Sequence, residues 1–270
     1  MKFTKMHGLG NDYIYVDCFQ ETLINPNAVS EAISRYHFGI GSDGLILICP
    51  SEVADCRMRM FNADGSEGIM CGNGIRCVGK YVYDHDIAKK PEITVETLDG
   101  IKTLQVTAED GKAAALRVDM GPARPGTLED IHVNGEDHKV FPVDMGNPHA
   151  VYIVENIADV KLEQIGPSYE NHPRFQPHRV NSEFVQILSD SHVRMRVWER
   201  GSGITLACGT GACATAVACC AQGLTGRDVD ITMDGGTLHV EWNAEDGHVY
   251  MTGPATEVFT GEIDVTPWDK

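Results

Sequence analysis

The chain has 270 residues, is 42% hydrophobic and carries a formal net charge of −17. This length suits two small domains, and the apolar share is sufficient for packed cores. The acidic excess, without any basic cluster, argues against nucleic acid or an anionic membrane surface as a partner. No apolar run approaches the roughly eighteen residues of a membrane helix, so we expect no membrane span.

The N-terminal segment Met1-Lys2-Phe3-Thr4-Lys5 leads directly into a predicted strand and lacks the features of a secretory signal. The nine cysteines are odd in number and mostly lie singly in apolar stretches, which favours reduced thiols over a disulfide framework. Paired C-x-x-C spacings are missing, so the sequence predicts no structural metal site. We therefore expect a soluble, cytoplasmic protein.

An internal repeat is the most informative feature of the chain. Arg57-Met58-Arg59-Met60-Phe61 recurs as Arg194-Met195-Arg196-Val197-Trp198, and Cys71-Gly72-Asn73-Gly74 recurs as Cys208-Gly209-Thr210-Gly211. Both pairs are separated by 137 positions. Further matches occur in the same order, among them Gly10-Asn11 with Gly146-Asn147 and Gly121-Pro122-Ala123 with Gly253-Pro254-Ala255. The sequence therefore predicts two copies of one module.

The two halves share one order of predicted elements. Strands are predicted over 13–17 and 56–61, then a helix over 72–84; in the second half the corresponding strands cover 151–155 and 192–198, and the helix covers 209–222. In each half three strands follow, separated by Gly-containing turns. Both helices are apolar around their whole middle, which indicates that they are buried.

This order predicts an α+β fold with two pseudo-symmetric domains. Each is expected to be a curled mixed or antiparallel β-sheet, barrel-like, around a central α-helix, with the active site in the cleft between the domains. We predict that residues 1–116 plus 256–270 form the domain carrying Cys71, and that residues 117–255 form the domain carrying Cys208.

Cys71 and Cys208 each lie immediately before a Gly-x-Gly sequence, where a helix is predicted to begin. The unpaired N–H groups of a first helical turn stabilise a thiolate, so we expect the pKa of both thiols to fall toward neutrality. One such cysteine alone is more often structural. Two of them, presented to a shared cleft, would place a base and an acid on opposite faces of one carbon, which is the arrangement that inverts a stereocentre by proton exchange.

Several motifs resemble those of the diaminopimelate epimerase family. Asn62-Ala63-Asp64-Gly65-Ser66-Glu67 with Met70-Cys71-Gly72-Asn73-Gly74 resembles its first signature, and Glu199-Arg200-Gly201 with Ala207-Cys208-Gly209-Thr210-Gly211 resembles its second. The segments Lys5 to Asp12 and Gly146-Asn147-Pro148-His149 are similar to two further blocks. The resemblance covers essentially the whole chain.

The resemblance implies interconversion of LL- and meso-2,6-diaminoheptanedioate, in lysine and peptidoglycan precursor synthesis, without pyridoxal phosphate, another cofactor or a metal. It also implies a homodimer. Cys71 and Cys208 would be the acid/base thiols, and His149 would support them. The implied substrate-binding residues are Asn11, Asn62, Gly72, Asn73, Asn147, Asn181, Glu199, Arg200, Gly209 and Thr210.

The residue types suit such a substrate, which carries two carboxylates and two ammonium groups. Asparagine offers a donor and an acceptor on one short side chain, and Arg200 offers a planar fork for a distal carboxylate. Each asparagine could instead be a turn residue that caps its own backbone, and His149 could be structural. Gly44 departs from the family pattern, which often has Gln there, so one side-chain contact is missing or replaced by water.

Other functions remain open at the level of sequence. The chain could be a racemase or epimerase of another amino acid, similar to proline racemases, or a catalytically silent amino-acid-binding protein. A thiol-redox protein is disfavoured, because the two cysteines are 137 positions apart and not in a C-x-x-C loop.

Overall fold

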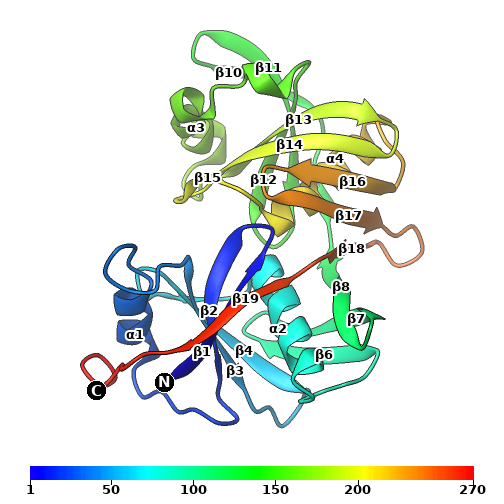
Figure 1. Ribbon diagram of the computed structural model, residues 1–270. Coiled ribbons are helices and arrows are strands. Elements are labelled where there is room, and N and C mark those ends of the chain that lie inside the picture. The colour runs from blue at the N-terminus through cyan, green and yellow to red at the C-terminus, as the bar shows by residue number, and fades with distance from the viewer. The chain divides into compact units, whose positions relative to one another are not determined.

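The computed structural model describes all 270 residues, which divide into two compact units. The first contains Met1–Val118 and Gly253–Lys270, and the second contains Asp119–Thr252. In Figure 1 the first unit runs from blue through cyan to the green of β7 and β8 and includes the red C-terminal strand, and the second unit runs from green to orange. The structure contains no helix with the length and apolarity that crossing a bilayer requires.

The first unit is built mainly from strands with two helices. Its elements are β1 (Lys2–Gly8), β2 (Asn11–Asp17), α1 (Pro26–Ile33), β3 (Gly44–Cys49), β4 (Cys56–Asn62), β5 (Glu67–Gly68), α2 (Gly72–Asp84), β6 (Glu92–Thr97), β7 (Gly100–Glu109), β8 (Lys112–Pro122, which runs into the second unit) and β19 (Thr256–Glu262).

The second unit also consists mainly of strands, with two α-helices. Its elements are β9 (Arg124–Pro125), β10 (Glu129–Val133), β11 (Glu136–Asp144), β12 (Pro148–Ile153), α3 (Leu162–Glu170), β13 (Asn181–Ser189), β14 (His192–Glu199), β15 (Gly203–Thr205), α4 (Gly209–Ala221), β16 (Asp228–Met233), β17 (Gly236–Trp242) and β18 (His248–Gly253), with short 3₁₀ turns at Ile157–Asp159 and Pro173–Phe175.

Strand directions repeat between the units. In the first unit β1–β2 is antiparallel, β2–β3 parallel, β3–β4 antiparallel, β4–β6 parallel and β6–β7 antiparallel. In the second unit β11–β12, β12–β13, β13–β14, β14–β16 and β16–β17 follow the same alternation. The predicted duplication is therefore a duplication of mixed-sheet topology.

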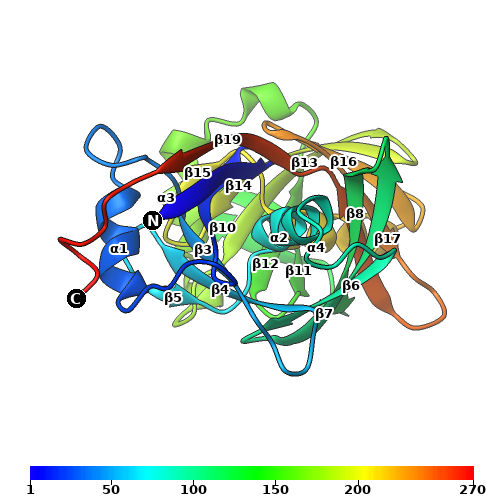
Figure 2. The same cartoon turned by 60° about the horizontal axis from the view of Figure 1, so that its bottom comes forward.

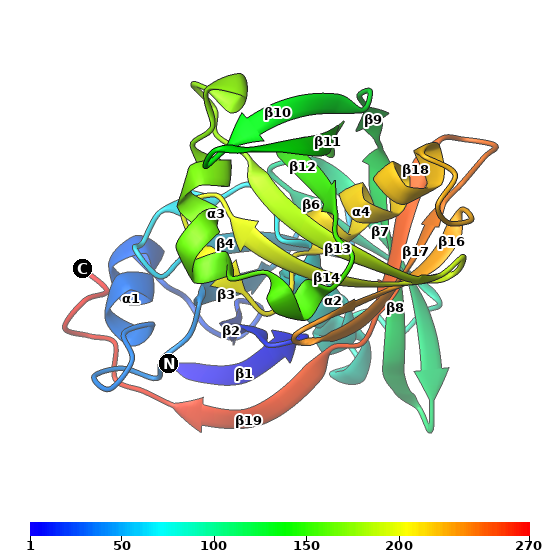
Figure 3. The ribbon, with the colours of Figure 1, turned by 90° about the horizontal axis from the view of Figure 1, so that it is seen from above.

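Each unit wraps its sheet around one helix. The helix α2 contacts β1, β2, β4, β6 and β7, and α4 contacts β11, β12, β13, β14, β16 and β17. Figure 2 shows strands on several sides of α2, and Figure 3 shows the strands around α4. Ten of the thirteen residues of each helix are buried. The α+β class with a curled sheet around a central helix is confirmed.

A second helix covers the outer face of each sheet. In the first unit α1 packs Val29 and Ile33 against a cluster containing Leu45 and Leu47 of β3. In the second unit α3 belongs to a cluster containing Tyr152 and Phe184. The inner strands β3 and β13 are thus covered on both faces, which explains why they are buried at consecutive positions.

Candidate active site

Cys71 is the N-cap residue of α2. Its extended backbone (φ −136°, ψ 117°) turns the sulfur back over the first helical turn, where Sγ accepts from the N–H of Gly74 at 3.3 Å. The thiol also donates to Oδ1 of Asn11, at 3.3 Å. The predicted start of this helix is correct, and the thiol and one predicted asparagine lie together.

Asn11 is held from its other side by a residue that the sequence did not single out. Its Nδ2 donates to Oδ2 of Asp43 at 2.7 Å, and the backbone N–H of Asp12 donates to the same oxygen at 3.1 Å. Because Nδ2 is bound to a carboxylate, Oδ1 is the atom that faces Cys71. Asp43 is therefore a positioning residue, one position before the strand β3.

Asn62 lies at the end of β4, in a row of paired residues that runs from Tyr13 through Gly44 to Asn62. Its Nδ2 donates to Oγ of Ser66 at 3.0 Å. A side chain at Gly44 would collide with the carbonyl oxygen of Phe61. The missing side-chain contact at this position therefore follows from a backbone approach that admits only glycine.

Gly72 and Asn73 form the first turn of α2 and are both buried. Arg76, which is fully buried, binds this turn: its Nη1 donates to the carbonyl of Gly72 at 3.1 Å and its Nη2 donates to Oδ1 of Asn73 at 2.9 Å. Its Nε donates to the carbonyl of Pro254 at 3.2 Å. The sequence pattern missed this arginine because it lies in an otherwise apolar helical stretch.

Cys208 repeats the geometry of Cys71 in the second unit. It is the N-cap of α4, and its Sγ accepts from the N–H of Gly211 at 3.3 Å. Oγ1 of Thr210 lies 3.7 Å from the sulfur and accepts from Nδ2 of Asn147 at 3.3 Å. Two predicted site residues, Thr210 and Asn147, are thus connected beside this thiol, and Gly209 lies in the same helical turn.

The expected fall in the pKa of both thiols is wrong for Cys208. Burial raises its pKa well above the usual range, and the neighbouring carboxylates of Glu199 and Glu183 raise it further. The N–H of Gly211 and the hydroxyl of Thr210 act in the opposite direction and are outweighed. Desolvation and two nearby carboxylates therefore exceed the stabilisation offered by the helix N-terminus.

Asn181, Glu199 and Arg200 lie where β13 and β14 pair. Oδ1 of Asn181 accepts from the backbone N–H of Arg200 at 2.9 Å, and its Nδ2 donates to the carbonyl of Pro148 at 3.2 Å. The guanidinium of Arg200 is exposed and donates to the carbonyl of His178 at 2.8 Å. Oε1 of Glu199 accepts from the hydroxyl of Thr205, and burial raises the pKa of this carboxyl.

His149 is wholly buried and connects two groups. Its Nε2 lies 3.0 Å from Oδ1 of Asn147, and its Nδ1 lies 2.6 Å from Oε1 of Glu183. Sequence reasoning missed Glu183, because nothing in the pattern of β13 separates it from an outward-facing polar residue. Of the predicted residues, Asn11 contacts Cys71, and Thr210, Asn147, His149 and Glu199 lie in contact with or next to Cys208 and its neighbours. The side chains of Asn62, Asn181 and Arg200 contact other residues.

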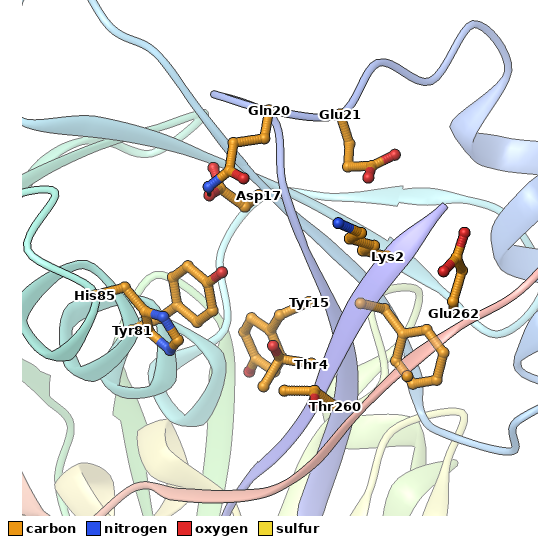
Figure 4. A pocket seen from close by; sticks show the side chains of 12 residues that line it. Lys2, Thr4, Tyr15, Asp17, Gln20, Glu21, Tyr81, His85, Thr260 and Glu262 are labelled. Atoms are coloured by element: carbon orange, nitrogen blue, oxygen red, sulfur yellow. Dashed lines mark hydrogen bonds between the residues drawn. The ribbon is translucent and has the colours of Figure 1, made fainter.

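A separate pocket of about 330 Å³ lies in the first unit and is lined by none of these residues. Figure 4 shows Tyr15, Tyr81, His85 and Thr260 around it, with Lys2 and Asp17 at its border. The rings of Tyr81 and His85 stack with centroids 4.0 Å apart. This pocket contains neither cysteine, so it is not part of the candidate active site.

The sequence model of diaminopimelate epimerase matches residues 3–125 and 141–258. The chain belongs to the diaminopimelate epimerase family. It is 54% identical over 278 residues to a diaminopimelate epimerase of Acetivibrio thermocellus, covering 98% of this chain and 99% of that one. It is 55% identical over 267 residues to one of Bacteroides thetaiotaomicron, covering 98% of each. Membership of this family makes the chain an isomerase of the epimerase type.

Solved structures with much lower identity share the fold. A probable proline racemase from Agrobacterium radiobacter has a TM-score of 0.74 at 17% identity, with 99% of this chain and 94% of that chain covered. A phenazine biosynthesis protein of the PhzF family from Bacillus anthracis has a TM-score of 0.76 at 16% identity, with 98% and 99% covered. The diaminopimelate epimerase family thus shares this two-unit architecture with proteins of other names.

Proposed function

We propose that the protein interconverts LL- and meso-2,6-diaminoheptanedioate by a two-base mechanism in which Cys71 and Cys208 act on opposite faces of the same α-carbon. The duplicated thiol geometry carries this proposal: in each unit a cysteine caps a buried helix and accepts from a glycine N–H at 3.3 Å. The relatives of more than 50% identity named diaminopimelate epimerase support the choice of substrate.

The proton balance of the reaction is simple. One sulfur, as thiolate, takes the α-proton, and the other, as thiol, delivers its proton to the opposite face, so that the two protonation states have exchanged places after each inversion. The raised pKa of Cys208 supports a substrate-free state in which this thiol carries its proton.

The remaining residues would bind the two ends of the substrate. N–H groups of the first helical turns, at Gly72, Asn73, Gly209 and Thr210, suit the carboxylate that takes on negative charge during the reaction. Glu199 and Arg200 suit an ammonium and a carboxylate. The asparagines at 11, 62, 147 and 181 would complete the polar lining, with His149 in support. In substrate-free form their amides are already oriented by Asp43, Ser66, Thr210 and Pro148.

The test follows the α-hydrogen in heavy water, with LL and meso substrate, for wild type, Cys71→Ala and Cys208→Ala. Wild type is expected to invert the carbon and to introduce deuterium, and each variant is expected to lose net inversion. Cys219→Ala, which removes a buried thiol from the far part of α4, is the matched control and should retain activity. Epimerisation that persists in either active-site variant would overturn the two-base assignment. Activity with proline-type compounds and none with diaminoheptanedioate would overturn the substrate assignment.

We also infer a homodimer in the cytoplasm, on the resemblance to the family. Sedimentation equilibrium would give twice the chain mass if this is correct, and cell fractionation would place the protein in the cytoplasmic fraction. A monomer at micromolar concentration would contradict the first inference.

A further inference from the structure

Glu183 is a carboxylate that the proposed reaction does not use. Its side chain on β13 has no exposed surface, Oε1 lies 2.6 Å from Nδ1 of the equally buried His149, and Oε2 has no hydrogen-bond partner. Burial raises the pKa of Glu183, and His149 opposes that rise. A buried carboxylate with one unsatisfied oxygen lowers stability, so its presence requires another explanation.

The duplicated unit shows that the fold does not need a carboxylate here. Register places Glu183 opposite Val151 in β12–β13, and the corresponding pair in β2–β3 is Ile46 opposite Tyr15. Both residues lie beneath the first turn of the buried helix. A Cβ on Gly211 would lie 2.8 Å from Oε1 of Glu183, and a Cβ on Gly74 would lie 2.7 Å from Cδ1 of Ile46. An apolar residue thus fills the same place in the other unit.

The hydrogen bonds connect Glu183 to the thiol. Oε1 contacts Nδ1 of His149, Nε2 of His149 contacts Oδ1 of Asn147 at 3.0 Å, and Nδ2 of Asn147 donates to Thr210 at 3.3 Å. The amide oxygen of Asn147 can only accept, so Nε2 must carry a hydrogen. The 2.6 Å contact at Nδ1 requires a second proton, either on the ring or on the carboxyl group.

We infer that Glu183 is a positioning residue, which retains this second proton at the contact with His149. The ring then keeps a hydrogen on Nε2. As a result, Asn147 keeps its side-chain carbonyl toward the ring and its N–H groups toward Thr210 and the substrate. The inference rests on the proposed function only for the substrate contact. Without the carboxylate, a neutral ring can present a bare Nε2, and the amide of Asn147 would then rotate by half a turn and offer its oxygen where a carboxylate should bind.

Nitrogen-15 NMR of the imidazole tests the protonation directly and without substrate. The signals of His149 are identified by their loss in His149→Gln. In wild type, Nε2 is expected to be protonated and Nδ1 to share a proton. Glu170→Gln is the matched control, because it removes another buried carboxylate of the same unit, one that binds Trp198 and Gly201, and it should leave the His149 signals unchanged. A wild-type ring with an unprotonated Nε2 would overturn the inference.

A double-mutant cycle tests how Glu183 acts. Glu183→Met keeps the approximate size of the side chain but can neither donate to Nδ1 of His149 nor accept from it. It is expected to lower kcat/KM by about 10- to 100-fold, the range found when a group that orients a metal-binding histidine is removed. In an Asn147→Ala background the same change should have almost no further effect, because both act through one amide. Fully additive losses, or unchanged kcat/KM in Glu183→Met, would contradict a positioning role.

The two tests separate this inference from the proposed function. If wild type does not act on diaminoheptanedioate, the substrate assignment fails while the NMR result still decides the protonation of His149. If wild type is active and Nε2 is bare, the proposed function stands and the role of Glu183 is wrong.

Discussion

The sulfur of Cys208 lies 3.3 Å from the backbone nitrogen of Gly211, yet burial and the neighbouring carboxylates raise the pKa of this thiol. Cys71 accepts from a glycine N–H at the same distance, but its side-chain neighbours are Asn11 and Tyr13. Cys208 has the carboxylates of Glu199 and Glu183 beside it. The repeat therefore duplicates the position of the thiol and not its electrostatic surroundings.

Cys208 should react slowly with iodoacetamide at neutral pH. Only the thiolate is alkylated, and the raised pKa of Cys208 moves thiolate formation to higher pH. Glu199→Gln removes the carboxylate that raises this pKa more than Glu183 does, and it should shift the alkylation profile of Cys208 to lower pH. Peptide mass spectrometry in a Cys71→Ala background resolves the site. Rapid alkylation at pH 7 in the parent protein, or no shift in Glu199→Gln, would contradict the electrostatic account.

Arg76→Met should lower the free energy of unfolding by about 1–3 kcal/mol, because it removes the guanidinium that donates to buried acceptors on Gly72 and Asn73. Urea denaturation measures the loss. Arg124→Met is the matched control, since that side chain is 81% exposed and its removal should change stability by less than about 0.5 kcal/mol. Equal stability of the two variants would show that Arg76 does not hold the first turn of α2.

Gly166→Ala should destabilise the second unit by about 1–3 kcal/mol, the usual cost of overpacking. A Cβ at this position in α3 would collide with the indole of Trp198, whose Nε1 is fixed by a 2.7 Å hydrogen bond to Glu170. Gly226→Ala provides the control, because the nearest atom to its Cβ is 3.8 Å away. Thermal unfolding compares the two, and an unchanged midpoint in Gly166→Ala would mean that α3 does not pack on β14 in this way.

The sequence was sufficient to predict the two helices and their capping cysteines, since the separation of 137 positions aligned both Gly-x-Gly sequences at once. It could not reveal Glu183, because a strand covered on both faces has no alternating pattern to mark a buried carboxylate. Arg76 was missed for a similar reason: its partners are backbone carbonyls and one amide, which leave no pattern in the sequence. The pKa of Cys208 depends on residues that the pairing of β13 and β14 brings together. The position of the thiol at a helix N-terminus, taken alone, therefore predicted a pKa shift in the wrong direction.

The central claim is that two sulfur atoms act on opposite faces of one carbon during each inversion. It is tested most directly by where deuterium from the solvent appears in the first turnovers. LL-diaminoheptanedioate is incubated with the enzyme in heavy water, and substrate and product are separated before a few per cent has reacted. We predict deuterium at the inverted carbon of the meso product and none in the recovered LL substrate, because the proton taken by one thiol is not the one returned by the other. Deuterium appearing equally fast in recovered substrate and in product would show that a single group removes and returns the proton, and would contradict the account.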